Sequence, residues 1–215
     1  MKAWYFSTVE KKLRYGDGRE IALGITHTVG GKPTPCERGL HGSVRLIDAL
    51  KYAPSPIVWE VELGGEVVED VNHDKYAATE RTYLRGGIDI SETLRAFSRW
   101  AALSVANLWD MPDVVRQYLE TGDASLTKAA ADTAAYAADA AAPSAADSAR
   151  AAACSAAYAA YAEASSLAIA YAIHFASSSS ISFAAKKEEL NRKLTEMVKA
   201  AITQAESEHA KEAKE

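Results

Sequence analysis

The chain has 215 residues, 48% of them hydrophobic, and a formal net charge of -5 at pH 7. This size suits one ordinary domain with an added segment, and the negative charge disfavours a nucleic-acid partner, which needs a clustered basic surface. Cys36 and Cys154 are the only cysteines, so no disulfide framework is expected. The N-terminus lacks a signal-peptide core, and the longest apolar run is about half the length of a membrane helix. We therefore expect a cytoplasmic protein without a membrane partner.

Residues 1–85 hold most of the glycine, proline and β-branched residues, which predicts a small α+β domain. Alternating patterns predict strands at 2–7, 19–29 and 56–71, with Gly64-Gly65 forming a hairpin or a bulge. In the last strand, one face is predicted to carry Ile57, Trp59, Val61 and Leu63, and the other Val58, Glu60 and Glu62. The run "SVRLIDALKYAP" predicts a helix that Ser43 caps and Pro54 ends.

Residues 86–122 are predicted to form a helical cover or connector. Apolar residues recur at spacings of three and four after a cap at Asp89 or Ser91. A second helix is expected to begin around Pro112 and to end at Gly122, because proline favours a first turn and glycine follows a last one. We expect both helices to lie over the sheet.

Residues 123–182 form an alanine-rich region. Roughly half of the residues from 129 to 185 are alanine, which has the highest helix propensity. Pro143 and the capping-box spacing of Ser144 to Asp147 predict one helix before the proline and a longer one after it. The serines of 177–182 are expected to break the second helix. Helices that are nearly apolar all round must pack, either within the chain or in a homo-oligomer. A β-solenoid and a simple spacer are the alternatives.

Residues 183–215 are predicted to form an amphipathic helix with a frayed end. Its apolar face carries Leu190, Leu194, Met197, Val198, Ala201 and Ile202. The predicted fold class is therefore α+β: a small N-terminal mixed sheet with covering helices, followed by an alanine-rich all-α region.

The stretch "PCERGLHGS" from Pro35 to Ser43 concentrates reactive side chains. Cys36 and His41, together with His27 or His73, are residue types that bind zinc, although Cys-x4-His has no CxxC partner. Cys36 could instead act as a nucleophile with one of these histidines as its base. The third interpretation is structural: the stretch is only the turn that leads into the helix.

Charged residues on the predicted strands give further candidates. Glu60 and Glu62 lie on one face and could act together on a hydroxyl or a cation, or could form a solvated outer face. The segment 74–85 offers a candidate anion-binding patch, or a charged strand edge. The residues that it offers for this role are Lys75, Glu80, Arg81 and Arg85.

Most of the chain resembles an uncharacterised family met mainly in bacteriophage and actinobacterial genomes. The resemblance rests on "PCERGLHGS", "DALKYA", "IVWEVELGGEVVED", "DKYAATERTYL" and an alanine-rich tail ending in "NRKLTEMV". Members of that family pair such an N-terminal domain with alanine-rich or repetitive tails. The resemblance implies a phage or prophage origin and no particular activity.

A shorter stretch, residues 38–67, is similar to the middle of ADP-ribosyltransferases. In those enzymes a turn aromatic stacks on nicotinamide, and the resemblance gives this place to His41. It also implies an early His or Arg on the first strand and a late Glu that activates the nucleophile. The stretch "KAWYFS" carries neither His nor Arg.

We therefore expect a phage or prophage accessory protein that acts by binding a host protein or a small ligand, without enzymatic activity or a cofactor. The candidate binding residues are Arg38, His41, Glu60, Glu62 and Arg81. One alternative is an ADP-ribosyltransferase-like enzyme that uses NAD. The other is a structural or assembly component of a phage particle.

Overall fold

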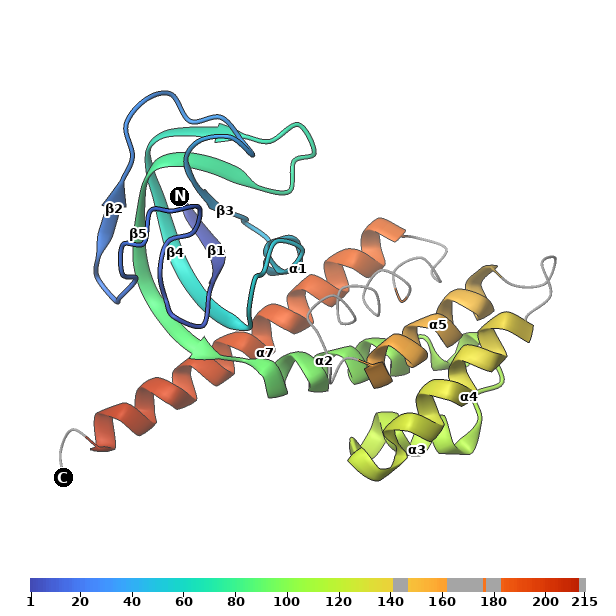
Figure 1. Cartoon of the computed structure of the whole chain (residues 1–215). Coiled ribbons are helices and arrows are strands. Elements are labelled where there is room, and N and C mark those ends of the chain that lie inside the picture. Colours follow the sequence, from blue (N-terminus) through green and yellow to red (C-terminus); the bar gives the residue numbers. More distant parts are fainter. Residues whose placement is uncertain (141–146, 162–175, 177–182, 213–215) are drawn as a thin grey trace. The chain divides into compact units, whose positions relative to one another are not determined.

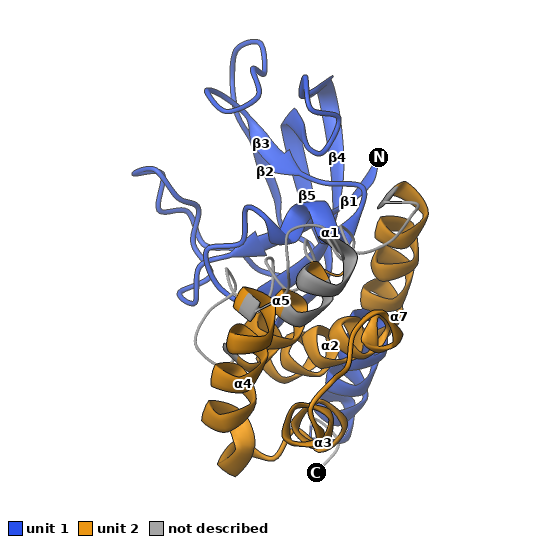
Figure 2. Ribbon diagram, turned by 90° about the vertical axis from the view of Figure 1, so that its right-hand side faces the viewer, with its two compact units in different colours: residues 1–90, 198–215 blue, residues 91–197 orange. Residues whose placement is uncertain are grey.

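A computed structural model describes residues 1–140, 147–161, 176 and 183–212. The chain divides into two compact units, which Figure 2 colours separately: residues 1–90 with 198–215, and residues 91–197. The first unit holds the sheet and the second holds helices (Figure 1). The predicted α+β class is confirmed.

The first unit is built on a five-stranded sheet in the order β1-β4-β5-β2, with β3 also paired to β5. Its strands are β1 (Lys2–Ser7), β2 (Thr26–Thr28), β3 (Leu40–Gly42), β4 (Ile57–Glu69) and β5 (Tyr76–Asp89). Each of these pairings is antiparallel, so in this detail the sheet differs from the expected mixed one. The strand expected over 19–29 is shorter, because only Thr26–Thr28 pairs with β5.

Gly64 and Gly65 form a bulge inside the long strand β4, rather than a hairpin. Gly64 pairs with Glu80 and Val67 pairs with Ala78, so two residues of β4 lie opposite Thr79 alone. Gly65 has a φ of 66°, and a Cβ built there would clash with Thr79 Oγ1. Glycine is therefore required at this bulge, which bends the strand.

The sheet curls back toward its first strand. Trp4 of β1 donates its backbone N–H to Ser43 O at 2.8 Å, and Ser43 N–H donates to Trp4 O at 3.0 Å. Ser43 therefore continues the sheet after β3 and does not cap a helix, which corrects the prediction. The helix α1 (Leu46–Leu50) begins after Arg45, without a side-chain cap.

The core of the first unit lies on one face of β4, as the alternating pattern predicted. Trp59 packs over Gly87, whose φ of 74° and missing side chain leave room for the indole. The indole Nε1 donates to Ser7 Oγ at 3.0 Å. The buried cluster consists of Ala3, Leu13, Ile21, Leu40, Ile57, Trp59, Val61, Leu63, Ala78 and Tyr83.

The second unit is helical. It contains α2 (Ser91–Leu103), η1 (Ala106–Leu108), α3 (Asp113–Thr121), η2 (Ala124–Leu126), α4 (Thr127–Ala140), α5 (Asp147–Tyr161) and the first part of α7 (Phe183–Glu212). As predicted, α3 ends at Gly122, whose φ of 69° is left-handed. The predicted breaks at Pro143 and Ser144 and over 177–182 lie outside the described residues.

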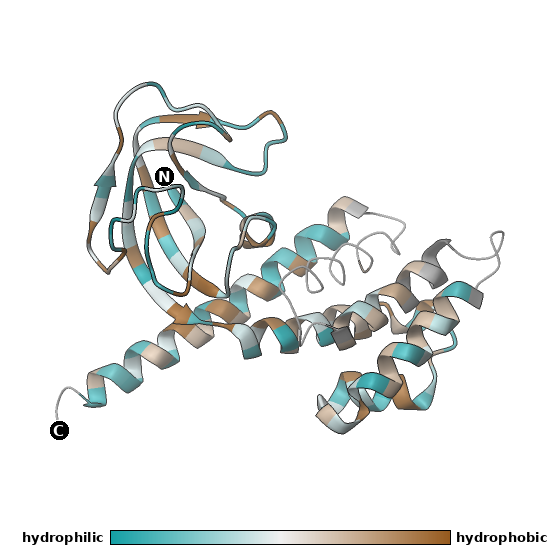
Figure 3. Ribbon diagram, in the orientation of Figure 1, coloured by the Kyte–Doolittle hydropathy of each residue, from teal (hydrophilic) through white to brown (hydrophobic). Residues whose placement is uncertain are grey.

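Alanine faces pack α4 and α5 within this unit. Ala130 and Ala134 of α4 and Ala156 and Ala160 of α5 are buried in one cluster with Tyr118 of α3. Figure 3 shows both helices mostly in pale colours, as expected for a composition dominated by alanine. Small side chains let helices approach closely, which offsets the little area that each alanine buries. Within the described part of the chain, no helix has the length and apolar character needed to cross a membrane.

Candidate functional site

The first unit contains a cavity of about 680 Å³, a volume typical of small-molecule sites. β1 contributes Trp4, Tyr5 and Phe6 to its wall, and β3 with its flanks contributes residues 36–43. The rest of the lining comes from the β1–β2 loop, α1 and β5, and from Val29, Tyr52 and Lys75, which lie just outside these elements. The full set is Trp4, Tyr5, Phe6, Leu13, Arg14, Tyr15, Asp17, Val29, Cys36, Glu37, Arg38, Gly39, Leu40, His41, Gly42, Ser43, Ala49, Tyr52, Lys75 and Arg81.

Arg81 is the buried charge of this cavity, with only 2% of its surface exposed. Its Nε and Nη2 donate to Tyr83 Oη at 3.0 and 2.6 Å, and its Nη1 donates to His41 O at 2.6 Å. The guanidinium also lies 3.6 Å from the ring centroid of Tyr5, within the range of a cation–π contact.

The position of Arg81 follows from the register of the sheet. Arg81 lies directly opposite Leu63, and directly opposite residues share one face of a sheet. Arg81 is therefore on the core face of β4. On its other edge, β5 places His27 opposite Arg81 and His41 opposite Ala77, so both histidines lie on this face too.

Arg81 keeps part of its hydrogen-bonding capacity unused. A guanidinium has five N–H groups, and three of them are accounted for by Tyr83 and His41. One N–H on Nη1 and one on Nη2 have no acceptor in the described part of the chain, which also offers no carboxylate within 4.0 Å of Arg81. A buried cation without a carboxylate is costly, and it attracts an anion.

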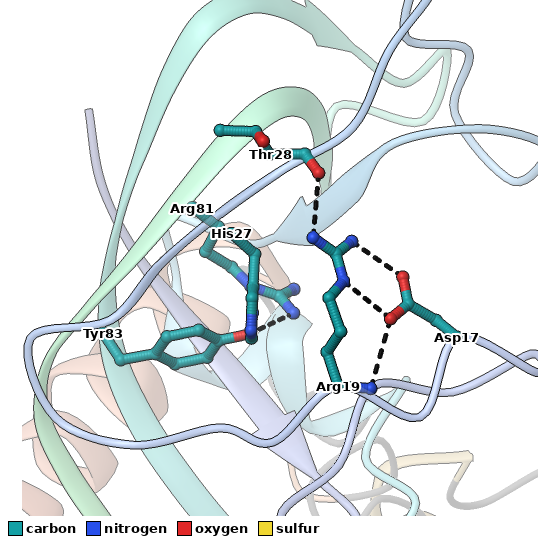
Figure 4. A network of polar contacts seen from close by, with 6 residues as sticks. All are labelled: Asp17, Arg19, His27, Thr28, Arg81 and Tyr83. Carbon is teal, nitrogen blue, oxygen red and sulfur yellow. Dashed lines mark hydrogen bonds and ion pairs between the residues drawn. The ribbon is translucent and has the colours of Figure 1, made fainter.

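Tyr83 and His27 hold Arg81 in place (Figure 4). Burial raises the pKa of Tyr83 despite the nearby guanidinium, so its hydroxyl keeps its hydrogen. Because Arg81 fills both acceptor positions of that oxygen, the hydroxyl donates to His27 Nδ1, 3.2 Å away. Burial, with Arg19 and Arg81 nearby, lowers the pKa of His27, which keeps its ring neutral. Arg19 itself pairs with Asp17 at 2.8 Å and lowers the pKa of that carboxyl to about 2.

His41 contributes a neutral donor to the cavity. Its Nε2 accepts the backbone N–H of Cys36 at 3.2 Å, so the hydrogen of a neutral ring is on Nδ1. Burial lowers the pKa of His41, and the positive charges of Lys75 and Arg81 lower it further. Among the described residues no acceptor contacts Nδ1, which leaves this N–H available to a ligand.

Lys75 is a second cation on the cavity wall whose side chain is fixed by contacts with its neighbours. Its Nζ lies 4.1 Å from the ring centroid of Tyr52. Burial on its own lowers the pKa of Lys75, but hydrogen bonding to Cys36 and the nearby Tyr52 raise it overall, so the ammonium stays charged. The Tyr52 hydroxyl donates to Asp74 at 2.9 Å, and Asp74 accepts from Lys51, so this carboxylate is engaged elsewhere.

Three of the five predicted site residues, Arg38, His41 and Arg81, line the cavity. Glu60 and Glu62 do not, because they lie on the opposite face of β4 from Leu63. Glu62 lies 4.0 Å from the N-terminal ammonium and Glu60 lies 4.0 Å from Lys2 Nζ. The register of the sheet therefore separates these two carboxylates from His41.

The charged side chains of the segment 74–85 do not form one patch. Lys75 and Arg81 line the cavity, whereas Arg85 donates to Glu206 of α7 at 2.5 and 2.9 Å. Tyr5, Tyr52 and Tyr83 were missed as site residues. The Arg81–Tyr83 spacing of two residues could have indicated that both lie on one face.

The stretch from Cys36 to Ser43 does not assemble a metal centre with the other histidines. His41 contacts the Cys36 backbone, and His73 pairs with Glu69 at 3.2 Å. Within the described ranges, no group of three or more His, Cys, Asp or Glu side chains could hold a metal ion. Cys36 is exposed, with a φ of 70°.

Together, the fold and the cavity define a small α+β domain with a ligand-sized cavity lined by aromatic and cationic side chains. Residues 6–96 match a domain of unknown function (DUF7666), and this match does not extend to the alanine-rich region. The match runs from β1 into α2 and includes every lining residue except Trp4 and Tyr5. No curated protein and no solved structure shows a significant match to the chain.

Proposed function

We propose that the N-terminal domain is a non-enzymatic binding module for a small organic anion that carries a planar apolar group. The observation that carries this proposal is Arg81, a buried guanidinium on the cavity wall with two N–H groups that have no acceptor among the described residues. A carboxylate or phosphate accepts two parallel N–H bonds from such a fork. Tyr5 and Tyr52 supply aromatic surface in the same cavity.

The charges of the lining support an anionic ligand. Arg14, Arg38, Lys75 and Arg81 line the cavity, and the acids there are Asp17 and Glu37. Because Arg19 pairs with Asp17, that carboxylate is already compensated. The cavity is therefore electropositive within a chain of net charge -5. Under this proposal, a phage or prophage accessory protein would act by sequestering or sensing a metabolite of the host cell.

An ADP-ribosyltransferase-like enzyme is the second candidate, because His41, to which that resemblance gives the place of the nicotinamide-stacking aromatic, lines the cavity. Such an enzyme needs a carboxylate near its nucleophile. Glu60 and Glu62 are outside the cavity, and the lining acids Asp17 and Glu37 are on loops. The observed arrangement therefore favours binding over transfer.

A thermal-shift panel tests the proposal on the full chain. Benzoate, phenyl phosphate, AMP and NAD are compared with neutral benzamide and adenosine, because a ligand that binds only the folded state raises the melting temperature. We expect stabilisation by anionic compounds, its loss in Arg81→Lys, and its persistence in the surface control Arg85→Lys. If none of the four anions binds, the proposal is wrong.

A second measurement keeps the test informative if Arg81→Lys does not fold. In wild-type protein, NMR spectra should show the bound anion shifting the Arg81 Nε–H signal and backbone signals of residues 36–43. Binding that leaves both sets of signals unchanged would contradict a site at Arg81. Formation of nicotinamide from NAD by the wild-type chain would instead establish the second candidate.

A further inference from the structure

The two cations that the protein holds in place in this cavity, Arg81 and Lys75, differ from the other cations of the lining. Arg14 and Arg38 are exposed, so water screens their charges. Arg81 is buried, and Lys75 is partly buried and held against Tyr52. Among the described residues, neither Arg81 nor Lys75 has a carboxylate within 4.0 Å.

Both cations line the cavity, and the positive charge of each lowers the pKa of His41. Lys75 directly precedes Tyr76, the first residue of β5, and Arg81 lies further along this strand. Arg81 donates to the carbonyl oxygen of His41, and the His41 ring accepts the backbone N–H of Cys36. Cys36 also lines the cavity, and its proximity raises the pKa of Lys75. The free Nδ1–H of His41 belongs to the same wall.

We propose that the ligand carries two separate acidic groups, one bound by Arg81 deep in the cavity and the other by Lys75, with a planar ring between them. This inference rests on the proposed function and specifies its ligand class: aromatic or similarly planar dianions. A single acidic group would leave one of the two held cations without a counter-charge. The Nδ1–H of His41, which also lines the cavity, favours a ligand that carries a hydrogen-bond acceptor as well.

The test compares matched pairs of probes that differ by one acid: benzoate with terephthalate, and phenyl phosphate with 4-carboxyphenyl phosphate. We expect the doubly acidic member of at least one pair to bind about tenfold or more tightly, as one further charge-assisted contact would give. Titration calorimetry on the full chain supplies the dissociation constants.

Two variants with the same change of charge separate a specific contact from general attraction. Lys75→Met should reduce the affinity for the doubly acidic probe to the affinity for the singly acidic probe of the same pair. The affinity for the singly acidic probe should stay unchanged. Lys32→Met is the control, because Lys32 is exposed and does not line the cavity. It should leave all affinities unchanged.

The outcomes distinguish this inference from the proposed function. Equal affinities within each pair, or an equal loss in Lys75→Met and Lys32→Met, would overturn the inference and leave an anion-binding module standing. The inference is also wrong if neither pair of probes binds. The proposed function is wrong only if AMP and NAD do not bind either.

Discussion

Removing one hydroxyl, in Tyr83→Phe, tests how Arg81 is held. The phenol oxygen accepts two N–H groups of the guanidinium, at 3.0 and 2.6 Å, and contacts His27 Nδ1 at 3.2 Å. Each hydrogen bond to a charged group contributes about 1.5–3 kcal/mol. Two such bonds give roughly 3–6 kcal/mol, and water entering the cavity recovers part of this loss. We expect Tyr83→Phe to lower the free energy of unfolding by about 3 kcal/mol.

The matched control is Tyr76→Phe, on the same strand. Its hydroxyl donates to Glu69 at 2.8 Å in an exposed position, so its loss should cost less than about 1 kcal/mol. Both variants keep the ring, which for Tyr83 preserves the edge contact with Trp59 at 5.3 Å. Urea titrations followed by NMR signals of the first unit give the two unfolding free energies. If Tyr83→Phe costs no more than Tyr76→Phe, the guanidinium does not depend on this oxygen.

Two further predictions concern the fold and its pH dependence. Gly65→Ala should destabilise the first unit by about 2–4 kcal/mol, because the positive φ and the clash with Thr79 both oppose a Cβ. An unchanged urea midpoint would contradict the bulge assigned to Gly65. Acidification should also destabilise it. The pKa values of His27 and His41 are lower in the folded chain than in the unfolded chain. As the pH falls below about 6.5, the unfolded chain therefore binds more protons than the folded chain. The free energy of unfolding should decrease from this pH down to the folded pKa values. Urea midpoints at pH 7.5 and 5.5 should show this decline, and His27→Gln should reduce it; an equal decline in the variant would contradict the role of His27.

Local patterns in the sequence predicted those strands and helices that depend mainly on the residues next to one another in the chain. Alternation identified β1 and β4, and glycine after an apolar repeat marked the end of α3. The run of alanine predicted α4 and α5, because helix propensity acts residue by residue. These signals need no knowledge of which segments meet in space.

The candidate site depends on pairings between distant residues, which no local pattern contains. His27 meets Arg81 and His41 meets Ala77 only through the order of the strands. The two-residue period correctly placed Glu60 and Glu62 on one face of β4, but it does not say which face borders the cavity. Ser43 was assigned to a helix cap because its return to Trp4 depends on the curl of the sheet.

The five N–H groups of Arg81 can be divided between a structural role and a proposed binding role. Two N–H groups donate to Tyr83 of the same strand, and a third joins β5 to β3 through His41 O. These bonds alone would explain a buried arginine with a structural role. A purely structural arginine, however, is cheapest when a carboxylate compensates its charge or when an apolar residue replaces it. Arg81 has no such carboxylate among the described residues, and its remaining N–H groups belong to the wall of a cavity rather than to a packed core. Under the proposed function, an anion in the cavity would supply the counter-charge that Arg81 lacks among the described residues.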